Sequence, residues 1–391
     1  MTRRDKLQMT DQFKKSPTYF RGAIPLIPRG VQCYFGEEVN RRRRVESILA
    51  AIARNWGFHE IILPFFDYLE DFVYGLGSQL GDRVYRFLDK DGSLLALRPD
   101  LTTLVAKTVA TRMTDHPVPV QLFYSGEVFR QERAGAGRQK EFYQIGLESM
   151  GVPETWADIE IILIAIDCLL HLGVEEFKIA LGNVGLFNGI VSGLDASHEK
   201  LQALRDAVDH RDSSRLELEV ADLGLSEEKK DFLVELPQLT GGREVVEKAL
   251  GIVRNPRSRK SLRELGEIHS VIESLGLERF LTLDLGEVRG LDYYTGMVFK
   301  VYSRSGGFEL GGGGRYDDLL GKFGWNLPAV GFSFTLDHIL PLVGETGQLE
   351  VPACPGEPRV LRTDGISSEE TFKQAWRLRR EGSCIQLAAR S

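Results

Sequence analysis

The chain has little cysteine, no excess of basic charge and no long uninterrupted hydrophobic run, and each shortage argues against a class of protein. Its four cysteines, among 391 residues, lie far apart with no Cys-x-x-Cys pair, which argues against a zinc site or a disulfide framework and favours reduced thiols in a cytoplasmic protein. The formal net charge of -7 argues against a broadly basic nucleic-acid surface, although not against a local basic patch. The seven histidines show no ligand spacing, so we expect no bound metal.

Neither a signal peptide nor a membrane span is predicted. The N-terminal sequence M-T-R-R-D-K-L-Q-M-T has no apolar segment behind its charges. The most apolar helical run, Ile159 to Leu172, is interrupted by Glu160 and Asp167 and is too short to cross a bilayer, so it predicts a buried helix. With 42% hydrophobic and 27% charged residues the composition is globular, and the length predicts one large domain plus a smaller one.

The N-terminal region predicts a long helix followed by a short edge strand. Apolar residues at helical spacing predict the helix from about Glu37 to Trp56. Its four consecutive arginines, Arg41 to Arg44, favour a solvated helix turn, with phosphate contact as the alternative. A strand from Phe58 to Leu63 ends at Pro64, which suits a sheet edge because proline has no N–H to donate.

Two oxygen-bearing side chains mark the next junction. A hairpin turning at Lys90 to Gly92 leads into a helix that starts after Pro99, and Asp100 and Thr102 lie at the helix start. Short oxygen side chains serve there equally for capping and for ligand binding, so the residues alone leave both roles open.

Leu122 to Gly151 predicts a long antiparallel hairpin, because two alternating runs flank a Gly/Ala-rich turn at Ala134 to Gly137. Arg130, Gln144 and Glu148 share strand parity within their arms, so we expect them to line one face. Such a face would hold an anion at Arg130 and a hydrogen-bonding or cationic group at Glu148. A salt-bridged sheet face is the alternative.

The stretch from Glu287 to Phe299, E-V-R-G-L-D-Y-Y-T-G-M-V-F, lies between two alternating apolar runs and places an arginine, an acid and two tyrosines together. Successive strand residues face opposite sides, so we favour Arg289 and Tyr294 in a pocket, with Asp292 or Tyr293 in support. Arg289 suits a carboxylate because its planar fork donates two parallel hydrogen bonds. The alternative is a Tyr-rich core strand with a surface arginine.

Between these informative stretches the sequence predicts an inserted helical region. Asn183 to Leu277 is helical and charge-rich, with breaks at Leu236-Pro237, Gly241-Gly242 and Asn255-Pro256 that indicate several short helices. Gly311 to Gly314 resembles a phosphate loop only superficially, since no lysine follows it, and is expected to allow close backbone packing against the pocket.

The C-terminal residues predict a strand (Arg359 to Arg362), a helix (Ser367 to Arg380) and a second strand (Cys384 to Leu387). These elements make at most a fragment of an α/β module, either a native appendage or a truncated end. The predicted organisation is α+β, with a main domain over residues 1–345, a helical insertion at about 183–277, and this short segment over residues 346–391.

Four of these stretches together resemble the catalytic domain of histidyl-tRNA synthetase, over about Pro28 to Val343. They are R-G-L-D-Y-Y-T-G-M-V-F, the F-R-Q-E-R hairpin, L-R-P-D-L-T and L-G-G-G-G-R-Y-D-D-L-L. The resemblance implies a class II aminoacyl-tRNA synthetase fold, an antiparallel sheet flanked by helices, which dimerises through the segment ending at Pro64.

The resemblance also implies a set of histidine-binding residues: Asp100, Thr102, Arg130, Gln144, Glu148, Arg289, Tyr293 and Tyr294. In that family's arrangement, Asp100, Thr102 and Gln144 hold the α-amino end. Glu148 and Tyr294 read the imidazole, and Arg289 takes the carboxylate. Arg130 and Phe142 correspond to the phosphate and adenine contacts of the synthetase.

The chain departs from the synthetase where ATP would bind. A glutamate-arginine pair in the synthetase's last motif grips the phosphates, but Asp337-His338 stands here, and a neutral histidine cannot replace a permanently charged fork. Lys140 and Glu141 replace arginine and glutamine in the hairpin, where Glu141 would repel ATP. Asp100 replaces a glutamate. The residues after Gly344 are fewer than a synthetase's tRNA-binding domain would need. We therefore expect a kept histidine pocket without ATP or tRNA machinery.

That combination resembles the regulatory subunits of ATP phosphoribosyltransferase. The resemblance implies a non-catalytic, cytoplasmic, histidine-binding subunit that needs no cofactor and controls the first step of histidine biosynthesis. Its partners would be a short-form catalytic ATP phosphoribosyltransferase subunit and a second copy of itself in a hetero-oligomer, with L-histidine as ligand and without tRNA or membrane. The alternative is an active histidyl-tRNA synthetase with an unusual last motif, and a structural helper of another enzyme is the third.

Overall fold

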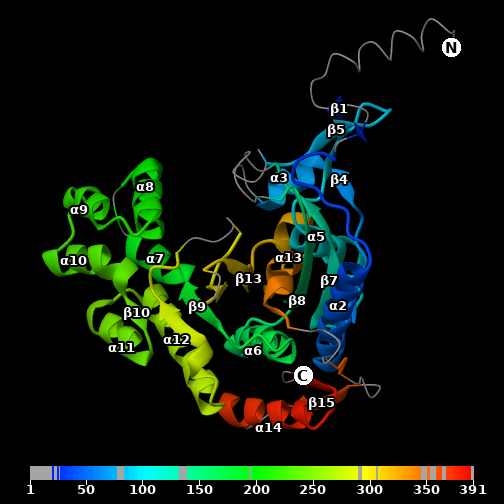
Figure 1. Cartoon of the computed structure of the whole chain (residues 1–391). Helices are drawn as coiled ribbons and strands as arrows, with labels where there is room; N and C mark the ends of the chain where they lie inside the picture. The colour runs from blue at the N-terminus through cyan, green and yellow to red at the C-terminus, as the bar shows by residue number, and fades with distance from the viewer. Residues whose placement is uncertain are drawn as a thin grey trace, which may run out of the picture.

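A nine-stranded sheet forms the centre of the protein, shown as a computed structural model in Figure 1. The structure describes residues 20–21, 24–25, 27–76, 83–131, 139–192, 194, 196–288, 293–304, 307–344, 350–352, 358–362 and 367–388. The strand order is β10-β11-β9-β12-β13-β14-β8-β7-β3. Adjacent strands are antiparallel except for β11–β9 and β7–β3, which are parallel. The expected sheet is thus present, but it is mixed rather than purely antiparallel.

The strands of this sheet are β3 (His59–Glu60), β7 (Val120–Phe129), β8 (Glu141–Met150), β9 (Phe177–Asn183), β10 (Thr240–Gly241), β11 (Leu281–Asp284), β12 (Met297–Ser303), β13 (Glu309–Arg315) and β14 (Ala329–Thr335). Smaller sheets are formed by β1 (Phe20–Arg21) with β2 (Ile24–Pro25), by β4 (Phe66–Tyr68), β6 (Leu94–Leu97) and β5 (Arg86–Leu88), and by β15 (Arg359–Arg362) with β16 (Ile385–Ala388).

The α-helices are α2 (Glu37–Asn55), α3 (Leu69–Leu76), α5 (Thr102–Arg112), α6 (Thr155–His171), α7 (Val184–Val191), α8 (His198–Asp209), α9 (Ser213–Ala221), α10 (Glu227–Glu235), α11 (Arg243–Ile252), α12 (Pro256–Ser274), α13 (Leu336–Ile339) and α14 (Ser368–Arg380). Short 3-10 turns are η1 (Leu236–Gln238), η2 (Glu278–Phe280), η3 (Leu320–Phe323) and η4 (Leu340–Leu342). No helix in the described ranges is long and apolar enough to span a membrane.

Helix α2 matches the predicted helix, but its arginines are not a solvated turn. Arg41 donates to the carbonyl oxygens of Leu340 and Val343, and Arg42 donates to the carboxylate of Asp337. Arg43 is the exposed member, and it pairs with Glu46. The prediction was wrong because the segment from α13 to η4 packs on α2 and supplies acceptors from about 300 residues away in sequence.

Strands β7 and β8 form the predicted long hairpin, with Leu122 opposite Glu148, Tyr124 opposite Gly146 and Gly126 opposite Gln144. Its turn, Ala134 to Gly137, lies outside the described residues. One face of β8 carries Gln144 and Glu148 toward a cavity, while the other carries Ile145 and Leu147 into the main core. The hairpin therefore places polar and apolar side chains on opposite faces.

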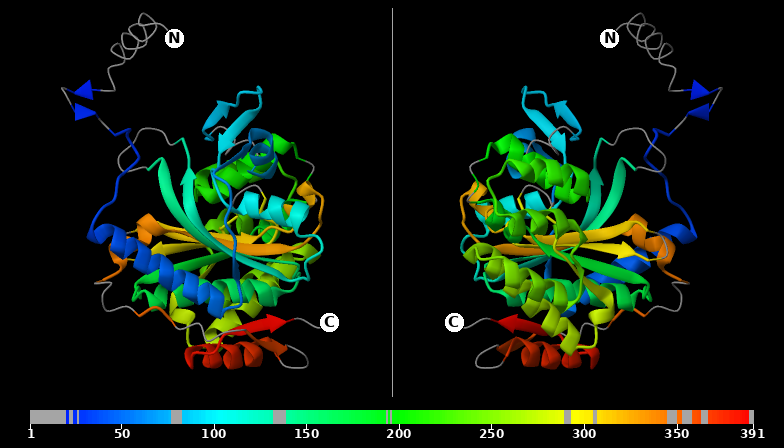
Figure 2. Two further views of the ribbon diagram at one scale, coloured as in Figure 1. Left: turned by 90° about the vertical axis from the view of Figure 1, so that its right-hand side faces the viewer. Right: turned by 90° about the vertical axis from the view of Figure 1, so that its left-hand side faces the viewer.

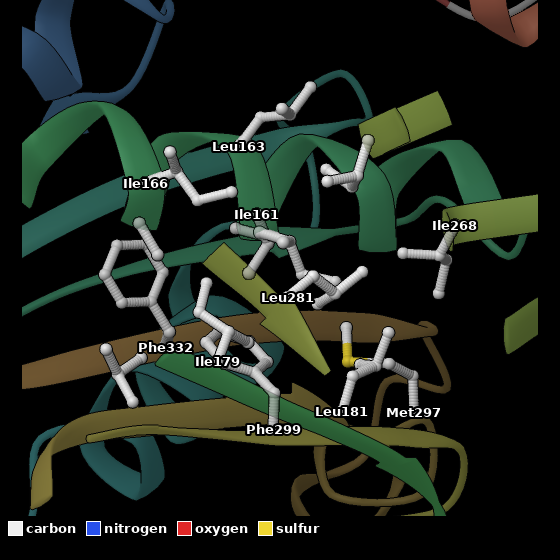
Figure 3. Close-up of a cluster of buried hydrophobic side chains, with 14 of the residues drawn as sticks. Ile161, Leu163, Ile166, Ile179, Leu181, Ile268, Leu281, Met297, Phe299 and Phe332 are labelled. Atoms are coloured by element: carbon white, nitrogen blue, oxygen red, sulfur yellow. The ribbon is translucent and has the colours of Figure 1, made fainter. Parts of the chain in front are cut away.

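Helix α6 is the predicted buried helix, and it packs against the sheet. Figure 3 shows Ile161 and Ile166 of α6 in one cluster with Ile179, Phe299 and Phe332 from three strands, and all five are buried. Burying each such side chain stabilises the fold by about 1.5–3 kcal/mol. The acids that interrupt the helix have partners. Asp167, for example, accepts a hydrogen bond of 2.9 Å from the indole N–H of Trp56.

The inserted region consists of α7 to α12, and each predicted break coincides with a structural one. Leu236-Pro237 begins the turn η1, Gly241 ends the short strand β10, and Asn255 caps α12 by accepting hydrogen bonds from the N–H groups of Arg257 and Ser258. Figure 1 shows α8 to α11 as a lobe beside the sheet, on the side away from α2.

The C-terminal strand, helix and strand also form as predicted, and they pack under α6 (Figures 1 and 2). Trp376 meets Trp56 edge to face at 6.2 Å between ring centroids. The Gln386 amide donates to Gln121 at 3.0 Å, and the Cys384 thiol donates to the Arg54 carbonyl at 3.1 Å. These contacts make the segment part of the folded body.

Candidate functional site

A cavity of about 560 Å³ opens at the β7–β8 hairpin and is walled by α5, β12, β13 and β14. Seven of the eight predicted site residues line it: Asp100, Thr102, Arg130, Gln144, Glu148, Tyr293 and Tyr294. The eighth, Arg289, and its predicted neighbour Asp292 lie outside the described residues. Residues separated by almost 200 positions in sequence are thus brought to one place.

Glu148 is the most enclosed acid of the cavity, with 1% of its surface exposed. Three hydroxyl groups donate to its carboxylate: Thr102 at 2.8 Å and Tyr124 at 3.0 Å to Oε1, and Tyr316 at 2.5 Å to Oε2. Burial raises the pKa of Glu148 to about 7 even though these hydrogen bonds favour its ionised form. The group therefore changes charge near neutral pH.

The backbone of β14 presses against this carboxylate. A Cβ atom added at Gly331 would lie 1.7 Å from Oε2 of Glu148, so a side chain there would collide with the acid. Glycine is thus required at this position by close approach rather than by an unusual backbone angle.

Asp100 caps helix α5, which is one of the two roles that the sequence left open, and it keeps one carboxylate oxygen available for the other role, ligand binding. Its Oδ1 accepts the Thr103 N–H at 3.2 Å at the start of α5, which is a capping contact. Its Oδ2 is buried and accepts no hydrogen bond from the described residues. Burial raises the pKa of Asp100, and the positive charge of Arg130 opposes that rise. A ligand cation would satisfy the free oxygen.

Arg130 lies at the hairpin end of the cavity. Its Nε donates to the carbonyl of Pro99 at 2.8 Å, and its guanidinium lies 5.0 Å from the ring centroid of Phe142. The two side chains form a charged and aromatic wall that suits a flat or anionic ligand group. Arg83 and Lys300 also line the cavity, and sequence analysis did not identify them.

Tyrosines provide another wall. Tyr293 contacts Tyr294 edge to face at 4.9 Å and Tyr316 at 5.6 Å between ring centroids. Sequence analysis missed Tyr316 and Tyr124, which hold Glu148. The signal for Tyr124 is the hairpin register, which places it on the same face as Glu148 and over Gly146, where an added Cβ would lie 2.5 Å from its hydroxyl oxygen.

The glycine run of β13 packs closely, as predicted, and forms no phosphate loop. Added Cβ atoms at Gly311 and Gly313 would lie 2.1 Å from the carbonyl oxygens of Ser333 and Gly331. Gly311, Gly312 and Gly313 expose backbone to the cavity. Strands β13 and β14 are therefore in closer contact than side chains would allow.

Asp337 and His338, which stand where the synthetase has its phosphate-gripping pair, are absent from the described residues that line the cavity. The Asp337 carboxylate accepts from Arg42 and, at 3.0 Å, from the N–H of Tyr143. His338 lies on the surface with Nδ1 2.6 Å from the Glu309 carbonyl oxygen. Both side chains are thus engaged in contacts of the fold.

Glu141 does not face the cavity, contrary to the expectation that it would repel a bound triphosphate. Strand alternation places it on the opposite face of β8 from Glu148, where it lines a second cavity of about 260 Å³ with Glu127 and Asp337. Burial and these two acids raise the pKa of Glu141. The expectation was wrong because Glu141 is seven residues from Glu148 in the same strand, and side chains an odd number of residues apart point to opposite faces of a sheet. In the described part of the chain, no group of His, Cys, Asp and Glu could hold a metal ion.

Comparison with known proteins agrees with this architecture. The family model of histidyl-tRNA synthetase matches residues 30–339. The ATP phosphoribosyltransferase regulatory subunit of Syntrophotalea carbinolica is 38% identical over 322 residues, covering 82% of this chain and 75% of the relative. The regulatory subunit of a Thermoanaerobacter species is 33% identical over 363 residues, covering 92% of this chain and 93% of the relative.

Solved structures share the fold. A Bacillus halodurans protein described as an ATP phosphoribosyltransferase regulatory subunit/histidyl-tRNA synthetase superposes with a TM-score of 0.76 at 28% identity, covering 93% of this chain and 92% of that one. The histidyl-tRNA synthetase of a Nostoc species gives a TM-score of 0.68 at 20% identity, which shows the fold alone. The class II synthetase-like fold is confirmed. The chain belongs to the family of ATP phosphoribosyltransferase regulatory subunits, which is built on the histidyl-tRNA synthetase fold.

Proposed function

We propose that this chain is a non-catalytic subunit that binds L-histidine in the main cavity and thereby regulates a short-form catalytic ATP phosphoribosyltransferase. The observation that carries the proposal is the cavity itself. It holds a buried acceptor, Glu148, and a carboxylate oxygen of Asp100 to which no described residue donates, in a chain whose relatives are named as regulatory subunits of that enzyme. The action would be in the cytoplasm, without tRNA, membrane or cofactor.

The ligand would lie with its imidazole toward Glu148 and Tyr294. Its ammonium group would meet Asp100 and Gln144, which are 4% and 7% exposed, so the contacts would be well desolvated. The Thr102 hydroxyl donates its hydrogen to Glu148 in this structure, so its oxygen would be the atom that accepts from the ammonium group of the ligand. Arg289 would take the carboxylate, as the family resemblance implies, and Arg130 and Tyr293 would close the site.

We also propose that the chain does not activate histidine with ATP, because of the residues that stand in place of the synthetase's phosphate-binding pair. Removal of preorganised charge from a transition-state site commonly costs about 3–4 kcal/mol. Asp337 and His338 bind α2 and β13 and cannot supply that charge. We therefore expect no histidine-dependent exchange of pyrophosphate into ATP. Exchange at synthetase-like rates would favour the alternative, an active histidyl-tRNA synthetase.

Self-association is proposed through the three-stranded sheet β4-β6-β5 and the segment that follows strand β3 and ends at Pro64. Ile62, Phe66, Tyr68 and Phe87 are between 40% and 91% exposed, and Phe66 and Phe87 touch edge to face. Apolar side chains gathered in this way are typical of an interface. A dimer would cover them within the hetero-oligomer.

The deciding experiment uses the chain reconstituted with the catalytic subunit of its own organism. Phosphoribosyl-ATP formation is followed against histidine concentration for the wild type and for Arg289→Ala. We expect the wild-type complex to respond to histidine and the variant to assemble but respond only at higher concentrations, because Arg289 is assigned to the ligand. Identical curves for both would place the regulatory site elsewhere. Titration of the isolated chain is the control, with histidine at 100 times its Kd expected to stabilise it by about 2.7 kcal/mol.

A further inference from the structure

The carboxylate of Glu148 is surrounded by donors on the protein side. Thr102 and Tyr124 both donate to Oε1, at 2.8 and 3.0 Å, and Tyr316 donates to Oε2 at 2.5 Å. The backbone of Gly331 closes the space beside Oε2, since an added Cβ would be 1.7 Å away. The carboxylate is thus fixed in orientation before any ligand arrives.

The number of acceptor positions that remain can be counted. An ionised carboxylate offers about four lone-pair positions, two on each oxygen. Two hydroxyls fill Oε1 and one occupies half of Oε2. With no further donor among the described residues, one position, on Oε2, remains. Of the two tyrosines, Tyr316 lines the cavity and Tyr124 is not among the described residues that do, so Tyr316 is the tyrosine beside the ligand and shares the oxygen that has the remaining position.

We propose that Tyr316 and Tyr124 are positioning residues that set the ligand selectivity of the cavity. With Thr102 they occupy three of the four acceptor positions of Glu148 and leave one for a ligand, which selects a ring with a single N–H at that point against groups with several parallel donors. This inference rests on the proposed binding of histidine and extends it from the ligand's identity to the reason for its selection.

The physical basis is the cost of an unpaired donor in a dry site. A guanidinium carries five N–H donors and an ammonium three, whereas imidazole presents one N–H along a given ring edge. A second donor directed at Glu148 finds no free acceptor, and leaving it unpaired weakens binding by about tenfold or more. Net charge alone would predict the opposite preference, because a cation is attracted to an ionised carboxylate.

The test compares two ligands on three forms of the full chain by titration calorimetry. The ligands are L-histidine and 2-amino-L-histidine, whose ring has the same size but carries further N–H donors at its edge. The forms are wild type, Tyr316→Phe and Tyr143→Phe. Tyr143 is the matched control, because its hydroxyl also donates to a carboxylate, that of Glu46 at 2.5 Å, but on the opposite face of the strand that carries Glu148.

We expect the wild type and Tyr143→Phe to prefer L-histidine by about tenfold or more, and Tyr316→Phe to lose most of that preference. The inference is overturned if wild type binds both ligands equally, or if Tyr316→Phe keeps the wild-type ratio. Should Tyr316→Phe fail to fold, as judged by its thermal melt, Tyr124→Phe replaces it. That variant must then also reduce the preference for L-histidine over 2-amino-L-histidine. A wild type that binds neither ligand refutes the proposed function instead, so the two failures are distinguishable.

Discussion

Replacing Arg379 tests whether the C-terminal segment is an integral part of the fold. Arg379 is buried under α6, where its guanidinium lies 3.4 Å from the ring centroid of Trp56 and 3.6 Å from Glu160. The two charged side chains are 5% and 0% exposed. In Arg379→Met, Glu160 would keep its buried place and its hydrogen bond from Gln121 but lose its counter-ion.

The magnitude follows from that burial. Removing one partner of a buried ion pair typically costs about 3–5 kcal/mol, because the remaining charge is uncompensated. Burial already raises the pKa of Glu160 to about 7 in the presence of Arg379, and without the arginine the rise would be larger. In the folded variant Glu160 then holds a proton that it releases above about pH 4.5 in the unfolded chain. The free energy of unfolding of the variant therefore falls as pH rises from about 4.5 to above 7. We expect the full loss at pH 8 and a smaller loss at pH 5.5.

The measurement is urea unfolding followed by tryptophan fluorescence, with Arg377→Met as the matched control. Arg377 is on the same helix but is 70% exposed and pairs only loosely with Glu381 at 3.9 Å, so its loss is expected to stay within about 0.5 kcal/mol. The double variant Arg379→Met, Glu160→Gln should recover part of the loss, since no charge is left buried. A loss below about 1 kcal/mol at pH 8, or one independent of Glu160, would refute the reasoning.

Three further outcomes are expected. Glu148→Gln should fold but bind L-histidine about 10- to 100-fold more weakly by calorimetry, because the ring N–H loses a charged acceptor; unchanged affinity would remove Glu148 from the site. Triazolylalanine, whose ring stays neutral, should bind wild type about tenfold more weakly at pH 6 than at pH 8, because the pKa of Glu148 is raised by burial to about 7 and its proton takes the acceptor position that is left for the ligand; a flat profile would contradict this. Gly331→Ala should lose ligand binding and stability in thermal melts, since its Cβ would lie 1.7 Å from Glu148, whereas Gly344→Ala, with no atom within 4 Å, should match wild type.

The elements with strong local patterns were predictable from the sequence. Helices α2 and α6, the β7–β8 hairpin and the C-terminal strand, helix and strand all form within four residues of the predicted bounds. Their signals are local, consisting of apolar spacing, turn residues and capping residues. Strand alternation also placed Gln144 and Glu148 correctly on one face, because the period of two holds along an unbroken strand.

Contacts between distant segments were not predictable in this way. The partners of Arg41 and Arg42 come from the segment around Asp337, and those of Glu160 come from β7 and α14. Tyr316 was overlooked for the same reason, since it reaches Glu148 from 168 positions away. Such pairings depend on how the sheet brings its strands together, which single-sequence patterns do not encode.

Two buried acids of the cavity carry a cost in stability that a ligand would relieve. Burial raises the pKa of both Asp100 and Glu148, so near neutral pH the folded state disfavours the ionised forms that the unfolded chain carries freely. Apolar side chains of similar volume would avoid this cost. A ligand that brings an ammonium to Asp100 and a ring N–H to Glu148 supplies the missing partners and returns the lost stability. Asp337 and His338 are engaged with α2 and β13, so in the proposed function the occupied state of the cavity, rather than an adenylate, would be what the catalytic partner senses.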